Sequence, residues 1–356
     1  ASFPTESAHA RRIPHSQETV PVERIMSLVG IFAIIGIGYL ISADRKNIKW
    51  RPVLVGVGIQ FFLGVCLFLI PPVRKGFEKF ADGVAEFLNL SVKGAEFVFG
   101  ELANAEKYGF IFVVQVIPTI IFFSAFIGIM YYLGVVQFVI GLIAKGVRKL
   151  MGTSGSETLS CSANIFVGQT EAPLLVNPFL GKMTHSELNA VMVGGFATIA
   201  GGVLALYIGM GIDPRHLIMA SVMAAPGALA MGKLLVPETE HSETAGDTKM
   251  PEIERGDNLL DAAAKGTTDG LQLAINVAAM LISFIALVAA ADWILGGIDK
   301  LIDGRLLSGL LGGEIHEATQ TYKGIIPGKL EIVFGYLFAP IAFLMGVPTN
   351  DVMALG

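Results

Sequence analysis

Long stretches without a charged side chain dominate the pattern of hydrophobic and polar positions along the chain. The longest, Tyr108–Ala144, has 37 residues. The others are Ile25–Ala43, Pro52–Val73, Leu188–Ile212, Leu217–Gly232, Gly270–Ala291 and Ile332–Asn350. A helix needs about 20 apolar residues to cross the hydrocarbon core of a bilayer, with a usual range of about 17–25. Most of these stretches therefore predict membrane-spanning α-helices.

The stretch Tyr108–Ala144 is too long for one crossing, so we expect it to turn near Gly134 and to continue along or into the membrane. Spanning β-barrels instead show short alternating segments separated by turns, which does not match these long runs. Composition agrees, because only 15% of the 356 residues are charged, whereas soluble domains carry about 25%. The predicted fold class is an all-α polytopic membrane protein.

Charge and cysteine content exclude several other classes. The net charge is −5, and the segment Pro237–Asn258, with seven acids and two bases, accounts for all of it. No basic surface remains that would indicate nucleic acid as a partner. Cys66 and Cys161 lie in apolar runs without metal-ligand spacing, so we expect buried thiols. Residues 1–24 predict a polar, disordered N-terminal tail without the apolar core of a signal peptide.

Basic residues in short loops predict the orientation. The segment "DRKNIKWR", residues 44–51, holds four basic side chains and is expected on the cytoplasmic side. The acidic loop 236–266 then falls on the same side, and the N-terminal tail falls outside. Residues 74–107 mix charges and aromatic side chains at helical spacing. This pattern predicts an amphipathic helix on the outer membrane surface.

The stretch "NIFVGQTEAPLLVNPFL", residues 164–180, places an amide, a hydroxyl and a carboxylate between Gly168 and Pro173. The uncharged arms before and after Glu171 have 13 and ten residues, which is too short to cross a bilayer. We therefore predict a re-entrant hairpin over residues 156–181, in which two half-helices enter the membrane and return. Irregular backbone at that depth is tolerated only where it packs in protein or lines a water-filled cavity.

The next predicted helix carries Gly194, Gly195, Gly201 and Gly202 around Thr198. Such glycines serve close helix packing or a local unwinding, and the residues leave both open. Interrupted helices near the midplane are where transporters bind substrates and ions. Asn164, one helical turn before the hairpin tip, could join free carbonyls in holding a hard cation such as Na⁺.

Glu171 is the main candidate for a functional group in the hairpin. A charge at the bilayer centre costs at least ~2.5 kcal/mol, so it indicates a functional site by default. A structural ion pair is the alternative for Glu171. Gln169 and Thr170 could likewise only satisfy backbone groups that the hairpin tip leaves free.

Several segments together resemble the concentrative nucleoside transporter family in its bacterial eight-helix form. They are "SCSANIFVGQTEAPLLV", "GGFATIAGG", "LQLAINVAAMLISFIALVA", "PTIIFFSAFIGIMYYLGV" and "FAPIAFLMGVP". The resemblance implies a homotrimer in the bacterial inner membrane, with scaffold helices and a transport domain of two inverted repeats led by re-entrant hairpins. It implies that Gln169, Thr170, Glu171 and Val203 bind the nucleoside. It also implies that Asn164, Thr198 and the carbonyls of Val167 and Ile199 hold Na⁺.

The resemblance also implies a division of the chain, and it places the second hairpin, with the ribose-binding residues, after Gly356. The expected parts are the tail 1–24, scaffold spans 25–135, a first transport repeat 136–235 with the hairpin 156–181, an acidic loop 236–266, a scaffold span 267–297 and an incomplete second repeat 298–356.

We therefore expect a transporter that imports nucleosides by symport with Na⁺ through alternating access, with Na⁺ as coupling ion and no organic cofactor. An H⁺-coupled symporter of the same family, with Glu171 as the proton carrier, is the alternative. A membrane-embedded enzyme is disfavoured, because Cys161 and the six histidines form no nucleophile–base or metal pattern. A channel is disfavoured because the polar residues cluster at one point.

Overall fold

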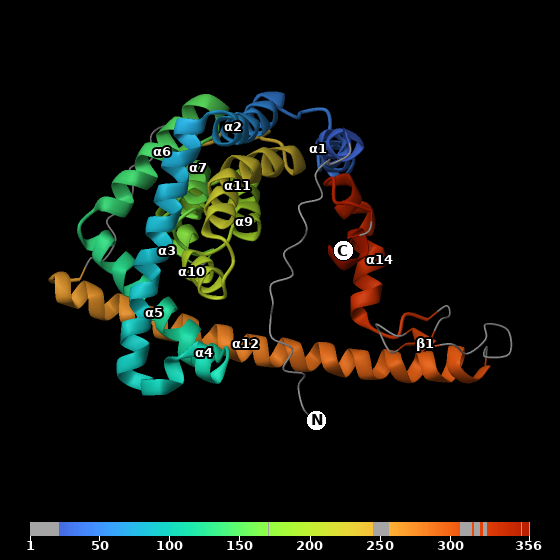
Figure 1. Ribbon diagram of the computed structural model, residues 1–356. Helices are drawn as coiled ribbons and strands as arrows, with labels where there is room; N and C mark the ends of the chain where they lie inside the picture. The colour runs from blue at the N-terminus through green and yellow to red at the C-terminus, as the bar shows by residue number, and fades with distance from the viewer. Residues whose placement is uncertain are drawn as a thin grey trace. The chain divides into compact units, whose positions relative to one another are not determined.

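The computed structural model describes residues 21–169, 171–244, 256–306, 315–316, 321–322, 326–349 and 351–355 (Figure 1). The tail predicted for residues 1–24 lies outside them, apart from its last four residues, which begin the first helix. The chain divides into two compact units, residues 38–281 and residues 1–37 with 282–356, and each is described by itself.

Helices account for nearly all of the described structure, which confirms the all-α prediction. The α-helices are α1 (Pro21–Ile41), α2 (Trp50–Leu69), α3 (Pro71–Phe99), α4 (Ala105–Tyr108), α5 (Phe112–Tyr132), α6 (Val135–Met151), α7 (Gly155–Ala163), α8 (Glu171–Leu174), α9 (His185–Ala197), α10 (Gly201–Gly209), α11 (Pro214–Leu235), α12 (Leu259–Leu301), α14 (Leu330–Leu344) and α15 (Val352–Leu355). The other elements are the 3₁₀ helices η1 (Gly100–Ala103) and η2 (Asn177–Lys182), the π-helix η3 (Ile302–Leu306) and the antiparallel strands β1 (Ile315–His316) and β2 (Thr321–Tyr322).

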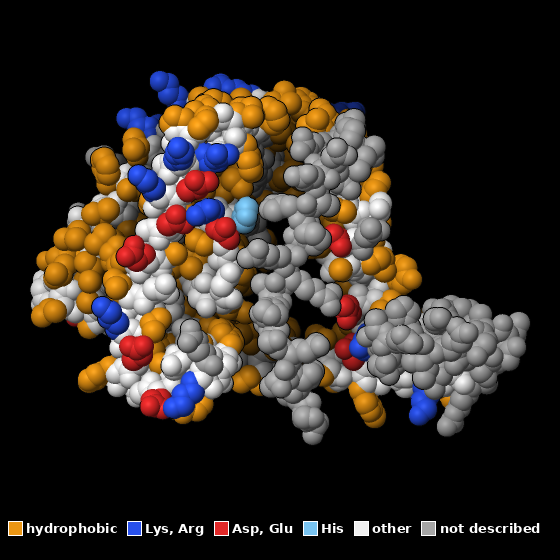
Figure 2. Space-filling view, in the orientation of Figure 1, with side chains coloured by type: hydrophobic (Ala, Val, Ile, Leu, Met, Phe, Trp, Pro, Cys, Tyr) orange, Lys and Arg blue, Asp and Glu red, His pale blue; other side chains and the backbone are white. Residues whose placement is uncertain are grey.

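Five helical segments in the described ranges are long and apolar enough to cross a membrane: α2, α5, α9 with α10, α11 and α12. Hydrophobic side chains cover wide areas of the visible surface between patches of charge (Figure 2). The turn predicted near Gly134 is present, because Gly134 has a left-handed φ of 78° between α5 and α6. The stretch Ile332–Asn350 falls short of a span, since α14 has 15 residues and is about 22 Å long.

Helix α3 covers most of the segment predicted to be an amphipathic helix. Its buried residues Ala81, Leu88, Ser91 and Ala95 follow one stripe with the spacing of successive helical turns, which explains why this face packs inward. Thr119 of α5 meets this stripe, and its hydroxyl lies 2.8 Å from that of Ser91.

Small residues bring α5 and α12 into close contact. A Cβ added at Gly266 of α12 would lie 2.5 Å from the carbonyl oxygen of Ser124, and one at Gly270 would lie 2.7 Å from the Ser124 Cβ. From the α5 side, a Cβ at Gly128 would lie 2.7 Å from the Ala262 carbonyl oxygen. Such small residues let helix backbones approach closely, which is a main source of helix association in membranes. Helix α12 is longer than the predicted span 267–297, with 43 residues.

The segment predicted as a re-entrant hairpin, residues 156–181, consists of two helical arms joined at residues 164–170, and the arms differ from the expectation. The first arm is the half-helix α7, nine residues and about 14 Å long. The return arm is not one half-helix, since it is divided into α8 and the 3₁₀ helix η2. Pro173 and Pro178 explain the division, because proline cannot donate a backbone hydrogen bond inside a helix.

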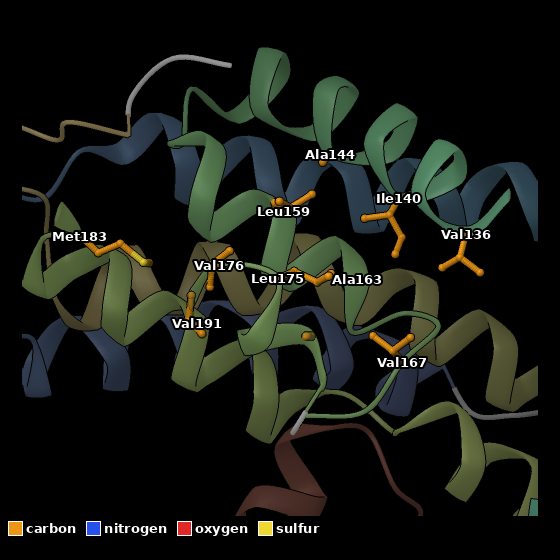
Figure 3. Packing of buried hydrophobic residues seen from close by; sticks show 11 residues of the cluster. Val136, Ile140, Ala144, Leu159, Ala163, Val167, Leu175, Val176, Met183 and Val191 are labelled. Carbon is orange, nitrogen blue, oxygen red and sulfur yellow. The ribbon is translucent and has the colours of Figure 1, made fainter. Parts of the chain in front are cut away.

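A hydrophobic cluster fixes the hairpin against its neighbours (Figure 3). Val136 and Ile140 of α6 lie on one side of it, Leu159 and Ala163 come from α7, and Val191 comes from α9. Helix α7 also packs on α9 at a glycine, because a Cβ at Gly194 would lie 2.7 Å from the Cys161 sulfur. Cys161 is fully buried, as predicted, whereas Cys66 is only half-buried.

The contact at Gly194 generates a first prediction. Gly194→Ala should destabilise the folded protein by about 1–3 kcal/mol, because the new methyl group overpacks against the Cys161 sulfur. Cys161→Ala removes that sulfur, so the double variant should regain most of the loss. Thermal unfolding of the detergent-solubilised protein measures the effect.

The neighbouring Gly195→Ala is the matched control. A Cβ there would meet the Gln169 Cβ at 3.5 Å, an ordinary contact, and alanine is the better helix former. Unfolding temperatures should therefore be unchanged or slightly raised in this control. Equal losses of stability in Gly194→Ala and Gly195→Ala would contradict the packing described above. So would a double variant of Gly194→Ala and Cys161→Ala that is no more stable than Gly194→Ala.

Candidate functional site

Both helices that lead to the site begin with the same capping arrangement. Ser154 caps α7, and its backbone N–H donates to Glu157 Oε1 at 2.8 Å. Thr184 caps α9, and its N–H donates to Glu187 Oε2 at 2.9 Å. The sequence analysis missed these two glutamates, although Ser-x-x-Glu and Thr-x-x-Glu are recognisable signatures of a capping box. The caps give α7 and α9 defined starting points.

Asn164 lies where α7 ends, at the beginning of the hairpin tip. Its side chain is fully buried, and neither its amide nitrogen nor its amide oxygen has a hydrogen-bond partner among the residues that the structure describes. Buried polar groups almost always have partners, because leaving one unpaired costs about 1–3 kcal/mol. The polar atoms of Asn164 are therefore open to a further partner, as are the buried hydroxyls of Ser160 and Ser162 in the same helix.

The helix after the hairpin is interrupted around Thr198. Helix α9 ends at Ala197, Thr198 and Ala200 have extended backbones, and α10 begins at Gly201. The Thr198 hydroxyl donates to the Gly194 carbonyl at 2.7 Å, so its oxygen keeps its lone pairs for another partner. Local unwinding, one of the two interpretations of the glycine pattern, is thus present.

Close packing, the other interpretation, is present as well. A Cβ at Gly201 would lie 2.2 Å from the Phe166 carbonyl oxygen, so only glycine lets α10 begin against the hairpin tip. A Cβ at Gly194 would lie 3.5 Å from the Asn164 amide nitrogen. The glycines therefore bring the hairpin tip and the helix interruption together.

The polar groups brought together here suit a hard cation that prefers oxygen ligands. Among the described residues, no backbone N–H outside the regular helices donates to the carbonyl of Val167 or Ile199. With the Asn164 amide and the Thr198 hydroxyl, these carbonyls would supply uncharged oxygens. Within the same residues no group of three or more His, Cys, Asp or Glu side chains could hold a metal ion, so a transition-metal site has no support.

The residues expected to bind the nucleoside are described only in part. Gln169 is exposed at the hairpin tip, and Val203 is half-buried on α10. Thr170 lies outside the described residues. Glu171 is the first residue of α8, but its side chain also lies outside them.

A second polar group of residues, missed by the sequence analysis, lies where α7 and α9 begin. Lys233 near the end of α11 is buried, and its Nζ lies 2.7 Å from Glu157 Oε2 and 3.1 Å from Glu238 Oε2. Its signal in the sequence is a lysine in the last turn of an otherwise apolar helix. Buried charges of this kind are nearly always paired.

Family models cover nearly the whole chain. The model described as "Na+ dependent nucleoside transporter N-terminus" matches residues 29–102. The model described as "Nucleoside recognition" matches residues 113–213, and "Na+ dependent nucleoside transporter C-terminus" matches residues 216–356. The capped helices, the hairpin and the helix interruption all fall in the second segment.

Individual relatives agree with these matches. The uncharacterized transporter YutK of Bacillus subtilis is 41% identical over 333 residues, covering 93% of this chain and 77% of YutK. Sodium/nucleoside cotransporter 2 of Rattus norvegicus is 40% identical over 92% of this chain and 46% of its own length.

Solved structures of the transporter CNTnw share the fold. Its inward-facing, substrate-bound state matches with a TM-score of 0.81 and 39% identity, over 93% of this chain and 74% of that one. A variant in an outward-facing state matches with a TM-score of 0.83 and 38% identity, over 95% and 77%. This chain therefore belongs to the concentrative nucleoside transporter family, whose members are membrane transporters and not enzymes.

Proposed function

We propose that the protein imports nucleosides by symport with Na⁺, through alternating access. The observation that carries this proposal is the Asn164 side chain, which is fully buried with both polar atoms unpaired and lies against Gly194, one turn before the helix interruption. The rat relative is named as a sodium/nucleoside cotransporter, which supports the same choice of ion.

The chemistry of the site favours Na⁺ as the coupling ion. Asn164, Thr198 and the carbonyls of Val167 and Ile199 present neutral oxygens, which can coordinate a monovalent cation but cannot carry a proton at physiological pH. The ion would hold the hairpin tip and the interruption between α9 and α10 in one arrangement.

Nucleoside binding is proposed at the exposed end of the same tip. Gln169 and Thr170 would contact the base, with Glu171 reaching it through water and Val203 forming a wall of the pocket. Because Na⁺ would already have ordered the tip, the nucleoside loses less conformational entropy on binding. Each ligand then raises the affinity of the other by the same factor.

In the proposed cycle, the hairpin and its partner helices α9, α10 and α11 move as one body against a scaffold that includes α5 and α12. We place the protein in the bacterial inner membrane as a homotrimer, with the nucleoside, Na⁺ and the lipid bilayer as its partners.

Uptake by proteoliposomes tests the proposed function. Radiolabelled uridine should accumulate when an inward Na⁺ gradient is imposed at equal pH, and the uptake should stop when choline replaces Na⁺. Uridine uptake that depends on an imposed pH gradient and is independent of Na⁺ would instead favour H⁺ coupling with Glu171 as the titrating group.

The ion site generates the next prediction. Asn164→Ala should abolish the dependence of nucleoside affinity on Na⁺, and it should lower the affinity to the sodium-free value of the wild type and no further. Thr198→Val should weaken the activation of nucleoside binding by Na⁺ and leave the sodium-free affinity nearly unchanged. Valine keeps the shape of threonine but lacks the oxygen ligand. Calorimetric titration of the purified protein at several Na⁺ concentrations measures both effects.

Asn276→Ala serves as the control for these variants, because Asn276 is exposed on α12. It should respond to Na⁺ as the wild type does. If Asn164→Ala kept the normal response to Na⁺, the ion would have to bind elsewhere.

The base site generates another prediction. Gln169→Ala should weaken nucleoside binding by about one to two decades, because it removes a hydrogen bond worth about 1–3 kcal/mol in a pocket from which the ligand displaces water. Gln272→Ala, at an exposed position on α12, is the matched control. Unchanged affinity in Gln169→Ala would mean that Gln169 supports only the hairpin backbone.

A further inference from the structure

Polar residues gather where α7 and α9 begin and α11 ends, away from the hairpin tip. We name this group the base cluster, and its members are Glu157, Glu187, Lys233, Glu238, Ser242 and Thr244. Glu157 and Glu187 have no exposed surface, and Lys233 is 5% exposed. A group of charges buried to this degree needs a reason, because removing charges from water is costly.

Lys233 is the central cation of the base cluster. Its Nζ lies 2.7 Å from Glu157 Oε2, 3.1 Å from Glu238 Oε2 and 3.0 Å from the Ser186 hydroxyl oxygen. These contacts join the end of α11 to the first turns of α7 and α9. Glu157, Glu187 and Lys233 also suit their helix ends, since the two glutamates lie in the first turns of α7 and α9 and the lysine lies in the last turn of α11.

The segment after α11 completes the cluster. The hydroxyls of Ser242 and Thr244 both donate to Glu187 Oε1, the latter at 2.7 Å. The Thr184 hydroxyl donates to Glu238 Oε2 at 2.8 Å. The Thr244 carbonyl accepts the Gly155 N–H at 2.9 Å. This part of the acidic loop is therefore attached to the bases of α7 and α9.

Helix α11 also contacts the hairpin at the tip. The Ser221 hydroxyl donates to the Ile165 carbonyl at 3.1 Å, one residue beyond Asn164. Ser221 and Lys233 thus attach the same helix to both ends of the first hairpin arm. The two attachments fix how far α7 can slide or rotate.

The ion site depends on the register of α7 and α9, that is, on the position of each helix along and around its own axis. Asn164 follows Glu157 by seven residues, about two helical turns, and Thr198 follows Glu187 by eleven, about three turns. A slip of one residue would rotate the Asn164 side chain by about 100° around the axis of α7. It would then no longer face Gly194 on α9, one turn before the interruption.

We propose that Glu157 and Lys233 are positioning residues for the cation site: their buried ion pair, with the rest of the base cluster, holds α7 and α9 in the register that brings Asn164 against Gly194, the residue whose carbonyl accepts the Thr198 hydroxyl. The proposal rests on the function proposed above for its sodium readout. Under this proposal, the first part of the acidic loop moves together with the hairpin and its partner helices.

Three variants of the full-length transporter test this proposal. Lys233→Met leaves the Glu157 carboxylate buried and without its partner, which is the most disruptive change. Glu157→Gln removes the charge but keeps an acceptor for the Ser154 N–H, and Lys233 keeps Glu238, so this change is milder. The double variant removes both charges. Lys182→Met is the matched control, because Lys182 is exposed in η2.

Two measurements on folded, purified protein are needed. The first is the Na⁺ concentration that gives half-maximal activation of nucleoside binding, together with the sodium-free affinity. The second is hydrogen exchange of the backbone amides at 164–169 and 194–199, measured without Na⁺.

We expect Lys233→Met to raise the Na⁺ requirement about tenfold or more while leaving the sodium-free affinity nearly unchanged, because the distortion acts on the ion site. Exchange at both segments should become faster. Glu157→Gln should show a smaller change in the same direction. The double variant should recover to about the level of Glu157→Gln and no further, because no Glu157 carboxylate is left unpaired but the ion pair is still absent. Lys182→Met should match the wild type.

Wild-type values in both measurements for Lys233→Met would overturn the positioning role, as would a double variant with wild-type values in both measurements, because that variant lacks the ion pair. If Lys233→Met does not fold, Glu157→Gln tests the proposal instead. Unchanged hydrogen exchange of the amides at 164–169 in Glu157→Gln would contradict the proposal. A wild type that shows no response to Na⁺ would overturn the proposed function, and the exchange measurement would still decide the proposal made here.

Discussion

The close approach of the hairpin tip to the interruption between α9 and α10 is the constraint on which the site depends. At Gly201 a single added carbon would lie 2.2 Å from the Phe166 carbonyl oxygen, and at Gly194 it would lie 2.7 Å from the Cys161 sulfur. Both segments carry irregular backbone, which is tolerated at membrane depth only where it is packed in protein or lines a polar cavity. Packed together, they place the unpaired Asn164 side chain against Gly194, whose carbonyl accepts the Thr198 hydroxyl one helical turn further along.

The helices that reach this point are short, so their far ends must be held well. Nine residues of α7 separate its capping box from the hairpin tip, and one-sided hydrophobic packing alone would allow small rotations. The ion pair between Lys233 and Glu157 is directional and buried, which restricts such rotations more than apolar contacts do. Ser154 and Thr184 satisfy the first backbone donors of α7 and α9 at the same place.

The contacts of α5 differ in character on its two sides. Towards α12 the helices meet at Gly128, Gly266 and Gly270 with backbone nearly touching backbone, which favours a fixed arrangement. Towards α10 the contact is an apolar cluster of Val116, Ile120 and Leu206, which Ala274 of α12 also joins, and a Cβ at Gly201 would lie 2.8 Å from the Phe123 ring. Apolar packing is non-directional, so movement along such a surface sacrifices few specific bonds. Under the proposed function, this apolar surface is where the moving body would slide against the scaffold.

The sequence by itself determined the fold class, most of the helices and the break in the chain between α7 and α8, because these follow from local properties. Runs of uncharged residues of a given length predict spans, Gly134 predicts a turn, and two uncharged arms that are too short predict a hairpin around Glu171. The glycines around Thr198 indicated both an interruption and close packing, and both are present. The tip motif also indicated the family.

Only the tertiary structure decided which partners these residues meet. Capping boxes at Ser154 and Thr184 are local and could have been found, but nothing local pairs Lys233 with Glu157, 76 residues earlier in the chain. The unpaired state of Asn164 likewise depends on what surrounds it in space. The return arm was wrongly predicted as one half-helix, because the ten residues after Glu171 are uncharged while its prolines divide the helix into α8 and η2. Spacing along the chain reports helical faces and lengths, whereas burial and pairing depend on segments that meet only after folding.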